Sequence, residues 1–392
     1  MTQVSRHAPL SERMLSYRAL DVEASGIRRI FDLGQRIADP INLSLGQPDF
    51  PVDPRIKSAA IRAIEGNRNG YSVTAGVPEL HDAIWTHLAG DVGWSKSDGL
   101  GLMVTNGTSG GLVLAALCLL DPGDEIVIPD PWFVLYPQLA KLAGGAVTVP
   151  VDTYPDFRMT ASRIEQVLTP RTKMVIVDSP GNPCGVVLSG QELADIADLC
   201  TRRGIMLVSD EIYDGFVFGD ALEGGRCPSP ARHGKDMLLI RGFGKTYGAT
   251  GWRLGYAAGP SWLIAQMTKL QQHIYICAPT PLQCAAAEAF HVDLSPVVAE
   301  YASRRDMIMD ALGDLTAIAT PHGAFYAFIE VPPRLGMTAQ QFCERAVERR
   351  LLVVPGGVFS RRDTHLRLSF AAPKPKLTEG LAVLRELFTR GF

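Results

Sequence analysis

The stretch Leu238-Leu-Ile-Arg-Gly-Phe-Gly-Lys-Thr-Tyr-Gly-Ala-Thr-Gly-Trp-Arg-Leu-Gly-Tyr256 is the most informative part of the chain. An apolar strand ends here near two glycines, and the amine of Lys245 follows. Glycine lets the backbone approach a ligand closely, so the strand brings a cation to a pocket. A lysine held in such a pocket can lose its proton and form a Schiff base with an aldehyde. On this segment alone, a surface lysine in a loop is an equally good interpretation.

Short apolar strands alternate with helical segments on both sides of this stretch. The segments predicted as strands are 102–105, 125–128, 146–149, 173–178, 205–209, 237–240 and 254–258. Amphipathic segments such as 190–203 separate them and predict helices. Strands that are buried on both faces and joined by helices form a mainly parallel sheet with helices on each side. The predicted fold class is therefore α/β, with this sheet at the centre of a large domain.

The remainder of the chain predicts a second, smaller α/β domain. Two helices come first, at 260–272 and 281–312. A pattern of strand, helix, strand, strand and helix follows, at 325–330, 338–349, 351–354, 364–370 and 376–389. With 392 residues the chain exceeds a typical single domain. We expect a large domain over 51–290, a small one over 291–392, and an N-terminal segment, 1–50, that packs with the small domain.

Composition argues against several classes of protein. A formal net charge of −3 gives no general attraction to nucleic acid or to an anionic membrane. The longest apolar run, 112–120, is much shorter than a bilayer span, and the charged N-terminus does not resemble a signal peptide. Seven cysteines without a Cys-x-x-Cys pair predict a reducing, cytoplasmic location with neither a disulfide framework nor a zinc site.

Ligands of such sheets bind beyond the carboxyl ends of the strands, so the residues that follow each strand are candidates. After strand 102–105 comes Asn106-Gly-Thr-Ser-Gly-Gly111, which opens a helix. The free N–H groups and the positive dipole end of a helix attract an anion, so Gly107, Thr108 and Ser109 predict a phosphate site. The alternative is an ordinary turn in which Thr108 or Ser109 caps the helix.

Two further segments carry an aromatic ring and an amide. Phe133, in Asp130-Pro-Trp-Phe133, can stack on a planar ligand, although packing in the core is an alternative. Asn182 lies among prolines and glycines in Asp178-Ser-Pro-Gly-Asn-Pro-Cys-Gly185, which hold its amide in place as donor and acceptor. A purely structural turn is the competing interpretation.

An acidic residue and a tyrosine follow strand 205–209. Asp210 comes directly after the strand, and a buried carboxylate there is costly unless it meets a cation. Tyr213, three positions further on, can point its hydroxyl into the same pocket.

Together these residues describe one ligand, which has an aldehyde, a planar ring, a protonated ring nitrogen, a ring oxygen and a phosphate. Their partners, in that order, are Lys245, Phe133, Asp210, Asn182 with Tyr213, and residues 107–109 with Arg253. Pyridoxal 5′-phosphate has all five features, and enzymes that use it pair a lysine Schiff base with an acidic partner of the pyridinium nitrogen.

The chain also resembles the class I/II aminotransferases, which are fold-type I pyridoxal-phosphate-dependent enzymes. The motifs that carry the resemblance are Gly46-Gln-Pro-Asp-Phe50, Tyr71-Ser-Val-Thr-Ala-Gly-Val-Pro-Glu-Leu80, Asn182-Pro-Cys-Gly185, Asp210-Glu-Ile-Tyr213, Lys245 with Gly251-Trp-Arg-Leu-Gly-Tyr256, and His365-Leu-Arg-Leu-Ser-Phe370. They extend over nearly the whole chain. The resemblance implies a ping-pong transfer of an amino group from an L-amino acid to a 2-oxo acid.

The resemblance also implies roles for individual residues. Lys245, Asp210 and Tyr213 would be catalytic, and a homodimer with shared active sites would bring Tyr71 to the partner's phosphate. Gly46, Asn182 and Arg367 would bind the substrate. A guanidinium fork suits the α-carboxylate, whereas a structural ion pair is the alternative for Arg367.

The chain departs from the family pattern at three positions. Gly242 and Gly244 stand where many relatives carry small polar residues, one of which often contacts the phosphate. Arg241 is a candidate to compensate, and the sequence leaves that question open. Cys184 replaces a commoner threonine within a retained Asn-Pro-x-Gly frame.

Two other functions fit parts of this pattern. A β-eliminating lyase of the C–S lyase type could use the same cofactor apparatus. A sensing module of a transcription regulator would need a basic DNA-binding domain ahead of the fold. Because the family pattern begins within the first few dozen residues, we expect an enzyme.

Overall fold

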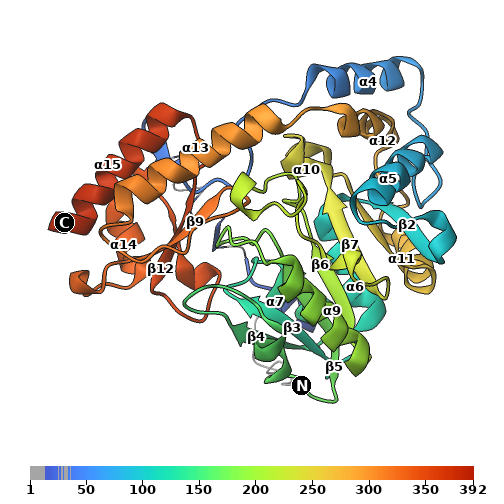
Figure 1. Cartoon of the computed structure of the whole chain (residues 1–392), viewed down its shortest axis with the longest axis horizontal. Helices are drawn as coiled ribbons and strands as arrows, with labels where there is room; N and C mark the ends of the chain where they lie inside the picture. The colour runs from blue at the N-terminus through green and yellow to red at the C-terminus, as the bar shows by residue number, and fades with distance from the viewer. Residues whose placement is uncertain (1–13, 25, 28–29, 31–33, 36) are drawn as a thin grey trace.

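The structure is a computed structural model that describes residues 14–24, 26–27, 30, 34–35 and 37–392. Its main feature is a seven-stranded sheet in the order β2-β8-β7-β6-β5-β3-β4 (Figure 1). The strands are β2 (Leu100–Thr105), β3 (Glu125–Asp130), β4 (Val147–Asp152), β5 (Thr172–Asp178), β6 (Met206–Asp210), β7 (Met237–Gly242) and β8 (Gly255–Pro260). Neighbours from β4 to β7 run parallel, whereas β8 is antiparallel to β7 and β2. The α/β class, the mainly parallel sheet and the existence of all seven predicted strands are confirmed.

Helices cover both faces of this sheet because its strands alternate apolar side chains between two cores. In β5, Met174 and Ile176 face one core, and Val175 and Val177 face the other. The first core also contains residues of α6 (Gly107–Leu119), α7 (Tyr136–Leu142) and α11 (Ser261–Ile274). The second contains residues of α4 (Pro54–Glu65), α5 (Pro78–Asp91), α9 (Gly190–Arg203) and α12 (Thr280–Ala286). The loops that carry the polar candidate residues lie at the carboxyl edge of the sheet, between the two layers of helices.

A smaller antiparallel sheet lies beyond the long helix α13 (Ser295–Leu312), at the left of Figure 1. Its strands, in the order β11-β12-β9, are β11 (Val354–Pro355), β12 (His365–Ser369) and β9 (Tyr326–Glu330). A separate pair joins β1 (Ile41–Asn42) to β10 (Leu351–Leu352) in parallel. Helices α14 (Ala339–Ala346) and α15 (Lys374–Arg390) complete this part, in which apolar side chains share one core.

Two predictions for the C-terminal part were wrong in detail. The segment 281–312 is not one helix, because α12 and a short 3₁₀ turn end by His291 and α13 begins at Ser295. Pro296 explains the break, since it has no N–H to continue a helix and suits the first turn of a new one. The segment 351–354 is not one strand, because β10 pairs with β1 whereas β11 pairs with β12.

The predicted domain boundaries at residues 50 and 290 stay predictions. In the N-terminal segment, β1 pairs with β10, whereas α2 (Tyr17–Asp21) contacts α7. The predicted packing of residues 1–13 lies outside the described residues. Among the helices that the structure describes, none is long and apolar enough to cross a bilayer.

Candidate active site

A cavity of about 210 Å³ lies where β5, β6 and β7 end. It collects every predicted site residue except Tyr71. These residues are Gly46, Gly107, Thr108, Ser109, Phe133, Asn182, Asp210, Tyr213, Lys245, Arg253 and Arg367. Segments far apart in the sequence therefore meet at one edge of the sheet, as expected for parallel α/β folds.

Lys245 lies in α10 (Phe243–Thr246), directly after β7, and its side chain reaches into the cavity. Its Nζ donates to the carbonyl oxygen of Gly46. Burial, helped by the nearby positive charges of Arg367 and Arg253, lowers the pKa of Lys245 to about 8. At neutral pH a larger fraction of such a lysine is unprotonated than of an ordinary surface lysine, so more of it can act as a nucleophile or a base. The interpretation of Lys245 as a surface residue is therefore wrong.

Asp210, the last residue of β6, is only 3% exposed. Its Oδ2 accepts a hydrogen bond from the Tyr136 hydroxyl at 2.9 Å, and its Oδ1 accepts one from the Ile212 N–H at 3.3 Å. Burial raises the pKa of Asp210 to about 6, against the effect of these two donors. Within the described part of the chain, no salt bridge neutralises this carboxylate. It is suited to a cation supplied by a ligand.

The predicted phosphate site lies at the start of α6. The helix begins at Gly107, and the preceding Asn106 makes no side-chain capping bond. Capping by Thr108 or Ser109 is therefore wrong. Gly107 has a φ of +71°, and a Cβ there would lie 2.6 Å from Nη2 of Arg253. The close approach that glycine permits puts the guanidinium against an uncapped helix N-terminus, which is a suitable donor set for a phosphate.

Aromatic and polar side chains line the middle of the cavity. Phe133 is half-buried and makes an edge-to-face contact with Tyr136, with ring centroids 5.6 Å apart. The hydroxyls of Tyr213 and Tyr326 are 3.0 Å apart, and both side chains are buried. Burial raises the pKa of the Tyr213 phenol well above its usual value, so it is a neutral hydrogen-bonding group.

Arg367, in β12, is only 1% exposed. Its Nη1 donates to Oδ1 of Asn182 at 3.0 Å and its Nη2 to the carbonyl of Ser44 at 2.8 Å, whereas Nε has no partner. The guanidinium lies 4.5 Å from the ring centre of Tyr326 and 4.7 Å from that of Phe359. Burial lowers the pKa of Arg367. Its neighbours are neutral acceptors, which argues against the structural ion pair considered from the sequence.

The sequence reasoning missed several lining residues, among them Tyr136, Asp178 and Tyr326. Tyr136 and Asp178 lie beside Asp210, and Tyr326 stacks on Arg367. Asp178 had a usable signal, since it ends strand β5 as Asp210 ends strand β6. Tyr326 had none, because its contact depends on how the two sheets are placed.

Tyr71 does not line this cavity and is 81% exposed. Val73, Ile61 and Ile64 nearby in the sequence are also exposed apolar residues. An aromatic residue in such a group is typical of a surface that packs against another chain.

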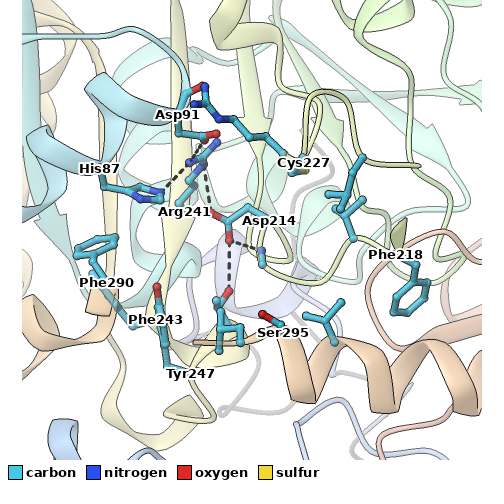
Figure 2. A pocket seen from close by; sticks show the side chains of 18 of the residues that line it. His87, Asp91, Asp214, Phe218, Cys227, Arg241, Phe243, Tyr247, Phe290 and Ser295 are labelled. Atoms are coloured by element: carbon cyan, nitrogen blue, oxygen red, sulfur yellow. Dashed lines mark hydrogen bonds and ion pairs between the residues drawn. The ribbon is translucent and has the colours of Figure 1, made fainter. Parts of the chain in front are cut away.

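A separate cavity of about 530 Å³ resolves the open question about Arg241 (Figure 2). Arg241 lines this second cavity and forms ion pairs with Glu211 at 2.8 Å, Asp91 at 2.7 Å and Asp214 at 3.4 Å. It does not line the cavity of Lys245. Arg241 therefore belongs to a buried charge cluster and does not replace the phosphate contact that many relatives make from the positions of Gly242 and Gly244.

Comparisons with known proteins agree on one family. The profile described as "Aminotransferase class I and II" matches residues 38–384. Putative aminotransferase YugH of Bacillus subtilis (strain 168) is 34% identical over 385 residues, with 95% of this chain and 97% of the relative covered. Aromatic-amino-acid aminotransferase 2 of Thermococcus litoralis is 33% identical over 376 residues, with 94% and 96% covered.

Solved structures give the same result. The aspartate aminotransferase from Thermus thermophilus with maleate superposes with a TM-score of 0.88 at 30% identity, with 95% of this chain and 99% of that chain covered. The crystal structure of Pyrococcus protein-A1 superposes with a TM-score of 0.89 at 32% identity, with 95% of this chain and 98% of that chain covered.

Proposed function

Because the chain belongs to the class I and II aminotransferase family, we propose that the cavity around Lys245 binds pyridoxal 5′-phosphate and an amino acid together. The chain is an aminotransferase, which moves an amino group from an L-amino acid to a 2-oxo acid. The lyase alternative is not favoured, since the relatives found carry aminotransferase names.

The observation that carries the proposal is a pair of cations, half-buried Lys245 and fully buried Arg367, that share one cavity. Neither forms a salt bridge with any carboxylate that the structure describes. A buried cation without a counter-ion is costly, so such a site favours anionic ligands. Lys245 suits an aldehyde and Arg367 a carboxylate, and Asp210 adds a negative charge to the same cavity.

The residues present fit the cofactor. When bound, it would supply an aldehyde for covalent attachment and a ring that accepts electrons from the substrate Cα. Gly107, Thr108, Ser109 and Arg253 would hold its phosphate, and Phe133 would cover its ring. Asn182 and Tyr213 would donate to its ring oxygen.

Asp210 would face the ring nitrogen. At pH 7 to 8 the carboxylate is ionised, because its pKa is about 6. An ion pair at about 4 Å contributes about 4 kcal/mol at an effective dielectric near 20. Asp210 would thus keep a proton on the ring nitrogen.

Lys245 would move the proton between the substrate Cα and the aldehyde carbon of the cofactor. With a pKa of about 8, roughly a tenth of the amine is unprotonated at pH 7. A base that titrates near the working pH transfers protons efficiently in both directions. The Gly46 carbonyl, which accepts from Nζ, would fix where the amine rests.

Arg367 would bind the substrate α-carboxylate. Two of its nitrogens are already held by Asn182 and Ser44, so the guanidinium is oriented before the substrate arrives. Pre-organisation of this kind lowers the entropic cost of binding.

We also propose a homodimer in which each subunit completes the other's site. The exposed apolar residues Ile61, Ile64, Tyr71 and Val73 support a surface covered by a second copy. Tyr71 would then reach the phosphate in the neighbouring site. The cytoplasmic location inferred from the cysteine pattern stays a prediction.

Incubating the purified chain with pyridoxal phosphate and a panel of amino donors tests the proposal. Aspartate and aromatic amino acids come first, since these occur in the names of relatives. We expect amino transfer that requires 2-oxoglutarate or pyruvate as acceptor. Release of pyruvate and ammonia without an acceptor would instead indicate elimination.

A further inference from the structure

A second carboxyl group lies beside Asp210. Asp178 ends β5, and the parallel register places it opposite Asp210 at the end of β6. Both residues line the cavity of Lys245. The Tyr136 hydroxyl donates to Asp210 at 2.9 Å, and it lies close enough to the Asp178 carboxyl for the two groups to influence each other's pKa. The proposed function gives Asp178 no role.

Hydrogen-bond counting assigns a proton to this group of three side chains. A tyrosine hydroxyl has one proton, and that of Tyr136 goes to Asp210. Toward Asp178, the Tyr136 oxygen can therefore only accept. Oδ2 of Asp178 accepts from the Asn182 N–H at 3.3 Å, whereas its buried Oδ1 has no partner in the described chain. A charged oxygen left unpaired pays its full desolvation cost, but a protonated one can donate to Tyr136.

The electrostatic surroundings agree with a neutral Asp178. Burial raises the pKa of Asp178 well above its usual value, and the charge of Asp210 raises it further. The Asn182 N–H acts in the opposite direction but more weakly. Two carboxyls that share a site cannot both ionise easily, so one keeps its proton. The other titratable groups coupled to Asp178 have raised pKa values and are neutral: Cys184, Tyr213 and Tyr326.

We propose that Asp178 is a positioning residue that keeps a proton and begins a one-way hydrogen-bond chain from Asp178 through Tyr136 to Asp210. Donors in series strengthen one another, so the chain holds the negative charge on Asp210. The role of this hydrogen-bond chain, which is to keep Asp210 charged opposite the cofactor ring, rests on the proposed function. The protonation of Asp178 does not rest on the proposed function, and it can be measured in the cofactor-free protein.

Two variants separate a proton-bearing role from simple packing. Asp178→Asn is neutral, has nearly the same shape and keeps an N–H donor for Tyr136. Asp178→Leu removes the donor. Asp236→Asn is the matched control, because Asp236 is exposed.

Infrared spectroscopy of the full-length, cofactor-free chain at pH 8 detects the proton directly. We expect a carbonyl band of a protonated carboxyl group in the wild type and in Asp236→Asn. The band disappears in Asp178→Asn. If all three proteins give the same spectrum in this region, the proposal is overturned.

The pH dependence of unfolding gives an independent readout with a definite sign. An unfolded aspartate ionises near pH 3.9, whereas folded Asp178 keeps its proton to a higher pH. Its contribution to stability is therefore complete at low pH and is lost as the pH rises toward the folded pKa. Relative to Asp178→Asn, the wild-type unfolding constant should rise by up to about tenfold per pH unit above pH 4. A ratio that stays constant or falls would contradict a protonated Asp178.

Cofactor titration of the same variants tests whether the hydrogen-bond chain from Asp178 through Tyr136 to Asp210 supports cofactor binding. We expect Asp178→Asn to bind pyridoxal phosphate within about threefold of the wild type, and Asp178→Leu to bind it about tenfold more weakly. Equal affinity of the two variants would overturn the hydrogen-bond chain. A wild type that stays colourless with the cofactor would instead overturn the proposed function and leave the infrared result intact.

Discussion

Replacing Arg367 with lysine separates substrate binding from cofactor binding. In the structure, Nη1 and Nη2 of Arg367 donate to Asn182 and Ser44, and Nε has no partner. A lysine has a single ammonium group, so it cannot keep both anchoring bonds and also present two parallel donors to a carboxylate. The loss of one charge-assisted hydrogen bond costs about 1.5–3 kcal/mol. That energy corresponds to a roughly 10- to 150-fold lower kcat/KM for the amino donor.

The assay is the half-reaction of the cofactor-loaded enzyme with an amino acid, followed by stopped-flow absorbance. Cofactor affinity, measured by titration of the cofactor-free chain, should be unchanged, because Arg253 rather than Arg367 lies at the predicted phosphate site. Arg202→Lys on the exposed face of α9 is the matched control and should behave as wild type. An unchanged kcat/KM in Arg367→Lys, or loss of the cofactor, would refute the reasoning.

Three further predictions concern the cofactor end of the cavity. As the pH falls below about 6, Asp210 takes up a proton, so the association constant for pyridoxal phosphate should drop by up to about tenfold per pH unit. The association constant of Asp210→Asn should not change with pH in this range. The same pH dependence in both proteins would contradict the pairing of Asp210 with the ring nitrogen. Gly244→Ser should bind the cofactor several-fold more tightly, because one added hydrogen bond is worth about 1 kcal/mol and a Cβ there would lie 3.4 Å from its nearest neighbour, which is ordinary contact. Gly242→Ser should lower the Tm instead, because its Cβ would lie 2.8 Å from Cδ1 of Ile212. Tyr71→Phe should weaken cofactor binding several-fold while sedimentation still gives a dimer, and an unchanged affinity would argue against a shared site.

Most of the fold and of the site was predictable from the sequence, because the strongest local patterns coincide with the functional edge of the sheet. Strand ends are marked by polar residues such as Asp210 after apolar runs, and this signal needs no knowledge of tertiary structure. The helix break before Ser295 was missed because alanine-rich periodicity outweighed a single proline at 296.

The unpredicted parts depend on contacts between distant segments. Tyr326 reaches the cavity only because the two sheets are placed as they are, and Arg241, near the end of β7, lines a different cavity. Side chains alternate between the two faces along a strand, but the predicted strand 237–240 ended before Arg241, so the face that Arg241 enters was not predicted. The Asp178–Tyr136–Asp210 cluster was missed for a related reason, since Tyr136 comes from a helix beside the sheet.

The central claim is that Lys245 is the residue to which the cofactor aldehyde attaches. Borohydride reduction of the cofactor-loaded chain, followed by peptide mass spectrometry, tests it directly. We predict a covalent adduct on the peptide that contains Lys245 and none in Lys245→Ala. An adduct on another lysine, or no adduct in the wild type, would contradict the account.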